Sequence, residues 1–197
     1  DKTYAGIKKE LSPYGVCGLD FKELETDEKK YVKKCFKEQI LPVLSPQIVD
    51  SSHPFPHLMN KDIYVTANLK HINSRKNKDD KEKEQILGIV PVPTYVSDIL
   101  MLPGHDIRYI RMEKVIMEYL DLVFDQYEVS DPNYICVTRN ADVSPDDEAL
   151  EVTDDFRKLM QSTLHKRRRM AVVRLETAEK LTPEMQEYFC KKFKITP

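Results

Sequence analysis

The stretches DIYVTANL at positions 62–69 and ILGIVPV at positions 86–92 determine how this chain folds. Apolar residues occupy every second position of the first stretch: Ile63, Val65, Ala67 and Leu69. This two-residue period is typical of a half-buried strand. Residues 70–84 between the stretches are mostly charged or amide side chains, which cannot bury enough apolar surface to form a packed element. We therefore predict an antiparallel hairpin with an exposed tip at 70–84.

Apolar residues at helical spacing predict helices on both sides of this hairpin. The expected helices are residues 1–11, Thr26 to before Pro42, 113–124, Ser144 to a basic end at 165–169, and Thr182 to Phe193. The other expected strands are 16–19, 107–112, 134–140 and 171–176, and the proline-rich stretch 42–56 is expected to be an ordered, irregular connection.

Strands and helices are interspersed in this sequence without strict alternation, which is typical of an α+β protein. We expect a single domain with a mixed sheet, an antiparallel hairpin and helices packed on the sheet. A length of 197 residues with 41% hydrophobic residues suits one such domain. The strands at 134–140 and 171–176, joined by a long helix, predict a right-handed crossover unit.

Composition excludes several classes of protein. The net charge of −2 argues against a dedicated nucleic-acid binder, which usually carries a basic excess. The mean hydropathy is −0.53, and no run of about 18 apolar residues or basic-then-apolar leader occurs, so we expect neither a membrane span nor a signal peptide. The four scattered cysteines indicate a reducing compartment, so we expect a cytoplasmic protein.

Motifs for a nucleotide or a metal are missing from the sequence. With five glycines, the chain has no glycine-rich loop that would hold phosphates. His53 and His57 in HPFPH have a spacing that suits a metal on a helix, but Pro54 and Pro56 force an extended path. We interpret this stretch as a packed loop and each isolated cysteine as a core residue, and we predict no metal.

Five arginines are the candidate anion-facing or interface residues: Arg139, Arg167, Arg168, Arg169 and Arg174. Arginine forks suit phosphate groups, and an arginine within a strand must find solvent, a carboxylate or an anion. Two interpretations stay open, because Glu176 is placed to satisfy Arg174 and the run 166–169 also complements a helix end. Residues 1–197 therefore contain a candidate anion-facing patch.

Five longer strings are more specific than the composition. They are ILPVLSPQIVDSSHPFPHLMN (40–60), VPTYVSDILMLP (92–103), YIRMEKVIMEYLDLVFDQYEV (109–129), VTRNADV (137–143) and KRRRMAVVRLE (166–176). Their order and spacing, from about Tyr14 to the end of the chain, resemble the head (middle) domain of long-chain polyphosphate kinase. One departure is that the family usually has Pro-Arg where this chain has Ser97-Asp98, so no role of that arginine passes to Asp98.

The resemblance implies a phosphotransferase parent in which phosphate moves from ATP to an enzyme histidine and then, reversibly and with Mg²⁺, to polyphosphate. In the family that histidine belongs to phospholipase-D-like domains after the head, and a helical domain precedes the head. None of the five histidines here matches it, so we expect an inactive fragment with no catalytic residue and no cofactor of its own. The family head domain takes part in dimer contacts and flanks the channel.

These implications assign residues 1–197 to the head domain, with 1–13 as the end of the preceding helical region. The chain starts with Asp1, which suggests a piece of a longer protein. Expected partners are the other parent domains, a second copy through the full-length enzyme, and polyphosphate, with no nucleic acid. The alternative is an independent anion- or RNA-binding module that uses the five arginines.

Overall fold

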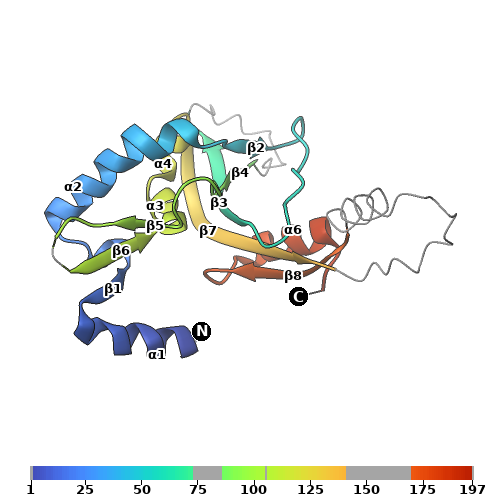
Figure 1. Cartoon of the computed structure of the whole chain (residues 1–197). Coiled ribbons are helices and arrows are strands. Elements are labelled where there is room, and N and C mark those ends of the chain that lie inside the picture. The colour runs from blue at the N-terminus through green and yellow to red at the C-terminus, as the bar shows by residue number, and fades with distance from the viewer. Residues whose placement is uncertain (1, 73–85, 105, 141–169, 197) are drawn as a thin grey trace, which may run out of the picture. The chain divides into compact units, whose positions relative to one another are not determined.

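The computed structural model describes residues 2–72, 86–104, 106–140 and 170–196. The helices in Figure 1 are α1 (Lys2–Leu11), α2 (Thr26–Cys35), α3 (Met112–Glu118), α4 (Leu120–Val123) and α6 (Pro183–Phe193). The strands are β1 (Val16–Leu19), β2 (Gln47–Val49), β3 (Ile63–His71), β4 (Ile86–Pro91), β5 (Ile99–Met101), β6 (Ile107–Arg111), β7 (Tyr127–Arg139) and β8 (Val172–Thr177). The expected helix from Ser144 and most of the expected hairpin tip lie outside the described residues.

Two sheets organise these strands and confirm the α+β class. A mixed sheet has the order β1-β6-β5, and an antiparallel sheet has the order β2-β4-β3-β7-β8. The predicted hairpin is confirmed, because β3 and β4 pair antiparallel from Tyr64 opposite Pro91 to Leu69 opposite Ile86. In the described ranges, no helix combines the length and apolarity that a membrane crossing requires.

The chain divides into two compact units. Unit 1 comprises residues 1–55 and 64–134, and unit 2 comprises residues 56–63 and 135–197. Strand β7 contributes its first part to unit 1 and its last part, with β8, to unit 2. The candidate arginines Arg139 and Arg174 both belong to unit 2.

Three expectations from the sequence need correction. The proline-rich stretch 42–56 is not wholly irregular, because it contains β2, which pairs antiparallel with β4. Strand β3 is an inner strand between β4 and β7, and it is buried on both faces instead of one: Tyr64 and Thr66 are 6% and 2% exposed, and Val65 and Ala67 on the other face are 0% and 1% exposed. The predicted right-handed crossover is wrong, because β7 and β8 pair antiparallel, with Thr138 opposite Arg174. A crossover of that kind joins parallel strands, and a long connection does not require them.

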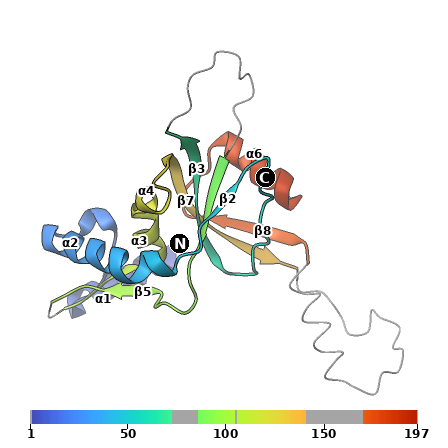
Figure 2. The ribbon, with the colours of Figure 1, turned by 90° about the horizontal axis from the view of Figure 1, so that it is seen from above.

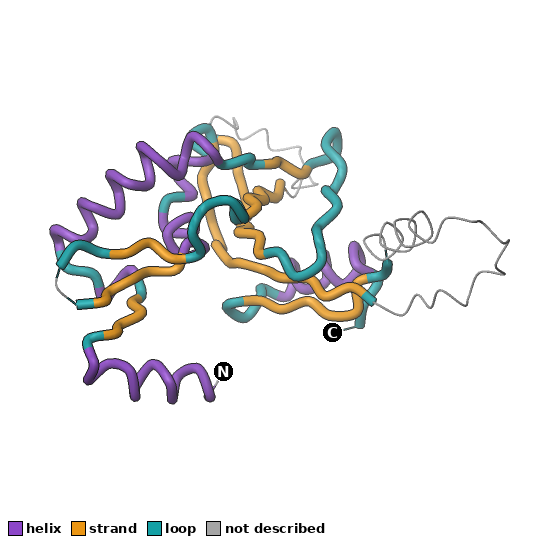
Figure 3. Tube along the Cα trace, in the orientation of Figure 1, coloured by secondary structure: helices purple, strands orange, loops and turns teal. Residues whose placement is uncertain are grey.

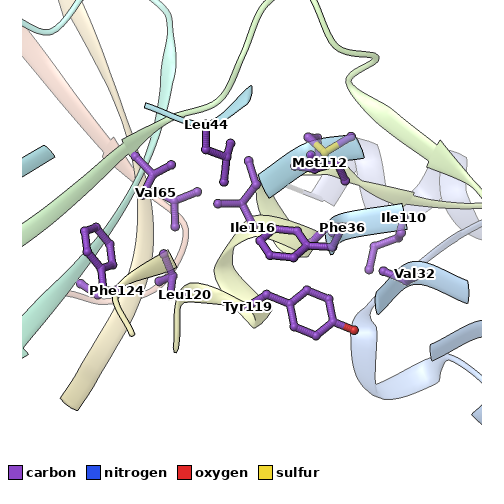
Figure 4. Close-up of a cluster of buried hydrophobic side chains, with 14 of the residues drawn as sticks. Val32, Phe36, Leu44, Val65, Ile110, Met112, Ile116, Tyr119, Leu120 and Phe124 are labelled. Carbon is purple, nitrogen blue, oxygen red and sulfur yellow. The ribbon is translucent and has the colours of Figure 1, made fainter. Parts of the chain in front are cut away.

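The core of unit 1 forms where α2 meets α3, α4 and β6. Val32 and Phe36 are fully buried, and the ring of Phe36 lies 4.9 Å from the ring of Tyr119 between centroids. Figure 4 shows these side chains together with Ile110 and Ile116. Figures 1 and 2 both place the C-terminal end of α2 beside α3, as this packing requires.

Both ends of the α2 segment differ in detail from the expected helix. The sequence lets Thr26 cap this helix, but Glu25 is the N-cap, and the backbone N–H of Glu25 donates to Glu28 Oε2 at 2.9 Å. Glu28 is almost buried and also accepts from Arg108 Nη2 at 3.0 Å, so the first turn of α2 is tied to β6. Beyond Cys35 the helix continues as the wider turn η3 (Phe36–Ile40) and the tighter turn η4 (Leu41–Val43), which contains Pro42.

Unit 2 has its own buried side chains, which come from loop 56–61 and from β7, β8 and α6. They are Leu58, Ile135, Val137, Val172, Met185 and Phe189. The predicted start of the last helix is confirmed, since Thr182 caps α6 by accepting the N–H of Met185 at 3.3 Å. Figure 3 shows α6 alongside β8.

A substitution at Gly88 in β4 tests the packing of unit 1. A Cβ at this position would lie 2.8 Å from two ring atoms of Phe124 and 3.0 Å from Leu69 Cδ1. We expect Gly88→Ala to lower the free energy of unfolding by about 1–3 kcal/mol, because buried neighbours must move. Urea unfolding followed by circular dichroism measures this change.

Gly6→Ala is the matched control, because a Cβ there meets nothing within 4 Å and alanine favours the helix. It should leave stability unchanged or slightly raised. Equal stability of Gly88→Ala and the wild-type protein would contradict the described contact between β4 and Phe124.

Candidate functional site

Arg139 ends β7 and directs its guanidinium at backbone carbonyl groups of unit 2. Its Nε and Nη2 donate to the carbonyl oxygen of Leu58 at 3.0 and 2.8 Å, and its Nη1 donates to that of Met170 at 2.7 Å. The Nη2 atom also lies 3.5 Å from His57 Nδ1. Three nitrogen atoms of the Arg139 guanidinium group therefore have partners within unit 2.

The backbone around Arg139 is held by the same loop. The N–H of Arg139 donates to Asn60 Oδ1 at 2.8 Å, and the N–H of Lys61 donates to the carbonyl of Val137 at 2.8 Å. The N–H of Asn140 donates to the carbonyl of Ala171 at 3.0 Å. Arg139 is thus the centre of a clamp that joins loop 56–61, the end of β7 and the start of β8.

Arg174 lies in β8 and has a different partner. Its Nη2 is 2.7 Å from Glu176 Oε1, which is the internal pairing that the sequence left open. The two side chains are 68% and 46% exposed, so the pair contributes at most about 1 kcal/mol to stability. An anion can therefore compete with Glu176 at small cost.

The structure describes two of the five candidate arginines, Arg139 and Arg174. Arg139 and Arg174 lie on neighbouring strands, as expected, but they bind separate partners. Arg167, Arg168 and Arg169 lie outside the described residues, so their place beside β8 stays a prediction. A polyanion-facing role for the set also stays a prediction.

A cavity of about 400 Å³ lies between β8 and α6, and its lining includes Arg174 and Lys180. Apolar residues of β8 and the thiol-bearing Cys190 of α6 form much of the remaining wall. Sequence reasoning did not single out Lys180, although its position three residues after β8 places it close to that strand. This volume suits a small ligand, and its two cations favour an anionic one.

Cys136 in β7 is only partly buried, so the interpretation of it as a core residue needs correction. Burial raises the pKa of its thiol, and the carboxylates of Glu176 and Asp62 raise the pKa further. A raised pKa leaves little thiolate, the form that acts as a nucleophile. The raised pKa therefore argues against Cys136 as a nucleophile, although the side chain is not part of the core.

The histidines of the HPFPH stretch have local partners. His53 Nδ1 lies 2.9 Å from Asp50 Oδ1, and His57 lies beside Arg139. Asp50 Oδ1 also accepts the backbone N–H groups of Ser52 and His53, so the turn is held internally. Among the residues that the structure describes, no group of three or more histidine, cysteine or acidic side chains is placed to hold a metal ion.

The clamp at Arg139 predicts a clear difference between two arginine variants. We expect Arg139→Ala to lower the free energy of unfolding by about 2–4 kcal/mol, because two carbonyl groups lose charge-assisted hydrogen bonds. Arg174→Ala is the control and should cost less than about 1 kcal/mol, since its ion pair is exposed. Urea unfolding of both variants measures these costs, and equal costs would rule out the clamp.

The environment of Cys136 predicts how its alkylation depends on Glu176. Glu176→Gln removes one charge that raises the thiol pKa and leaves Arg174, which lowers it, without its partner. The thiolate fraction at pH 8 should increase, so iodoacetamide should modify Cys136 about twofold faster or more. Peptide mass spectrometry reports the rate at Cys136 separately from the other cysteines.

Glu187→Gln is the control for this measurement, because exposed Glu187 is not among the groups that shift the Cys136 pKa. An unchanged or slower rate in Glu176→Gln would show that Glu176 does not act on this thiol.

Comparisons of this chain with a family model and with individual proteins point to the same family. The family model described as the polyphosphate kinase middle domain matches residues 27–197. The polyphosphate kinases of Bacillus cereus and Halalkalibacterium halodurans are 33% and 34% identical over 167 and 173 residues. These alignments cover 84% and 87% of this chain but 23% of each relative.

A solved structure shares the fold. The crystal structure of polyphosphate kinase from Porphyromonas gingivalis matches with a TM-score of 0.70 and 24% sequence identity. The match covers 99% of this chain and 26% of that chain. The chain therefore spans about a quarter of the length of the relatives that it matches.

Proposed function

Because the chain belongs to the polyphosphate kinase middle-domain family, we propose that it is the non-catalytic head domain of a polyphosphate kinase. The parent transfers the terminal phosphate of ATP reversibly to polyphosphate, and this domain acts as a scaffold. The family match over 27–197, together with coverage of about a quarter of each relative, supports this proposal most strongly. In this proposal, residues 1–13 are the end of a preceding helical region.

We place the phosphorylated histidine of the parent outside residues 1–197. The resemblance supports this, because none of the five histidines stands at the position of the family's phosphorylated histidine. His105 and His165 lie outside the described residues.

ATP and Mg²⁺ are, in this proposal, bound by other parts of the parent. The head domain contributes contacts in a homo-oligomer and flanks the channel through which the polymer passes. A cytoplasmic location is supported by four cysteines without disulfides.

A second candidate function is anion binding by unit 2 itself. The cavity that contains Arg174 and Lys180 favours it, because two cations line a space of ligand size. Within the proposed parent, polyphosphate is the anion that such a cavity would meet. An independent RNA-binding module is less favoured, since the chain has a net charge of −2.

The proposed scaffold role predicts that the 197-residue chain has no kinase activity. Incubation with ATP labelled at the terminal phosphate and Mg²⁺ should leave no acid-labile label on the chain and form no polymer, because no phosphoenzyme forms. A full-length polyphosphate kinase treated in parallel is the positive control. Reproducible acid-labile label on any of the five histidines would contradict the proposal.

A further inference from the structure

One side of α2 and of the turn that continues it carries four exposed lysines. Lys30, Lys33, Lys34 and Lys37, here called the lysine face, are all exposed, whereas Val32, Cys35 and Phe36 are buried. Lys33 and Lys34 each lie three or four residues from both Lys30 and Lys37, so the four lysines share one helical side. The opposite side is fixed in the core of unit 1.

This arrangement places like charges next to one another. The lysine face contains like-charge pairs at the i,i+3 and i,i+4 spacings, and such pairs destabilise a helix. Lys30 has Asp27 at 3.0 Å, but those side chains are 73% and 93% exposed, so the pair is weak. Within the described residues, Lys33, Lys34 and Lys37 have no carboxylate within ion-pair distance.

The described arginines, by contrast, all have partners within the fold, and of these the exposed pair of Arg174 and Glu176 is the one open to exchange with an anion. Arg108 pairs with Glu28, and Arg111 lies 2.6 Å from the buried carboxylate of Glu113. Arg139 binds carbonyl groups, and Arg174 pairs with Glu176. The lysine face therefore concentrates positive charge that remains open to a ligand.

The geometry of the face selects a linear polyanion. From Lys30 to Lys37 the helix rises by roughly 10 Å, so the ammonium groups form an elongated strip. Lysine is a flexible point charge without the planar fork of arginine, which suits a polymer of repeating phosphates better than one fixed carboxylate. Three cavities of the described residues have linings that include none of these four lysines.

RNA is less favoured than inorganic polyphosphate at this strip. Binding of single-stranded nucleic acid combines positive charge with aromatic platforms on which bases stack. Tyr31 is the aromatic residue exposed among these lysines, at 38%, and its hydroxyl bonds the Cys35 side chain on the same helix. Polyphosphate has no bases and needs charge alone.

We infer that the lysine face of α2 binds inorganic polyphosphate through its phosphate oxygens. The identity of the polymer rests on the proposed function, whereas the position of the binding surface comes from the described residues. This surface belongs to unit 1 and differs from the arginine set that the sequence suggested. It would hold a stretch of polymer on the scaffold domain.

The test is a titration of polyphosphate of medium chain length into the 197-residue chain at several salt concentrations. Replacing the four lysines of the face by glutamine should weaken binding about tenfold or more at low salt and flatten its salt dependence, because fewer counterions are released. A second variant with Lys9, Lys191, Lys192 and Lys194 replaced by glutamine loses the same charge elsewhere. It should stay within about twofold of the wild-type affinity.

Two further variants address misfolding and binding at the basic run 166–169. Replacing the lysines of the face by arginine should retain binding, which separates loss of charge from loss of folding. Arg167→Ala, Arg168→Ala, Arg169→Ala should bind like the wild-type chain, and loss of binding in this variant alone would place the polymer on the basic run. Equal weakening by both glutamine variants would show that binding follows net charge, and it would overturn the inference.

A single-stranded RNA homopolymer of similar charge tests the remaining alternative. If it binds as tightly as polyphosphate and competes for the same lysines, the assignment to polyphosphate is wrong. Absence of binding by the wild-type chain overturns the inference but leaves the non-catalytic role intact. Phosphoryl label on the chain would instead contradict the non-catalytic role and would leave the inferred binding surface intact.

Discussion

The contact between the rings of Phe36 and Tyr119 joins the α2 segment to α3 and α4 at the core of unit 1. Their centroids lie 4.9 Å apart, and both side chains are buried. Tyr119 stands at the break between α3 and α4, so the contact ties the end of the α2 segment to both short helices. With this side of α2 fixed, the lysine face is necessarily turned towards solvent. Core packing thus determines which charges the domain displays.

Unit 2 depends on a polar constraint instead. Arg139 binds the carbonyl groups of Leu58 and Met170, which lie 81 and 31 residues away in the sequence. In the clamp, the Arg139 guanidinium joins separate segments of unit 2. The exposed pair of Arg174 and Glu176, in contrast, is open to exchange with an anion. The two arginines look equivalent in sequence, yet their partners give them different roles.

The sequence predicted local features well. The alternation at 62–69 indicated β3, and Thr182 with Pro183 indicated the start of α6, because both signals depend on neighbouring residues. The break at Tyr119 was missed because the apolar spacing continues across it, although its backbone leaves the helical region with φ −111° and ψ 27°. The antiparallel pairing of β7 and β8 and the partners of Arg139 depend on residues far apart in the chain. No local pattern encodes such contacts.

Lysine acetylation with and without polyphosphate is the decisive measurement of whether core packing presents a polymer-binding face on α2. Brief treatment with an amine-reactive acetyl ester, followed by peptide mass spectrometry, reports each lysine separately. Without polymer, Lys30, Lys33, Lys34 and Lys37 should all react readily. With polymer, these four should be protected while Lys191 and Lys192 react as before. Equal protection of all lysines, or protection confined to other positions, would contradict a binding surface on α2.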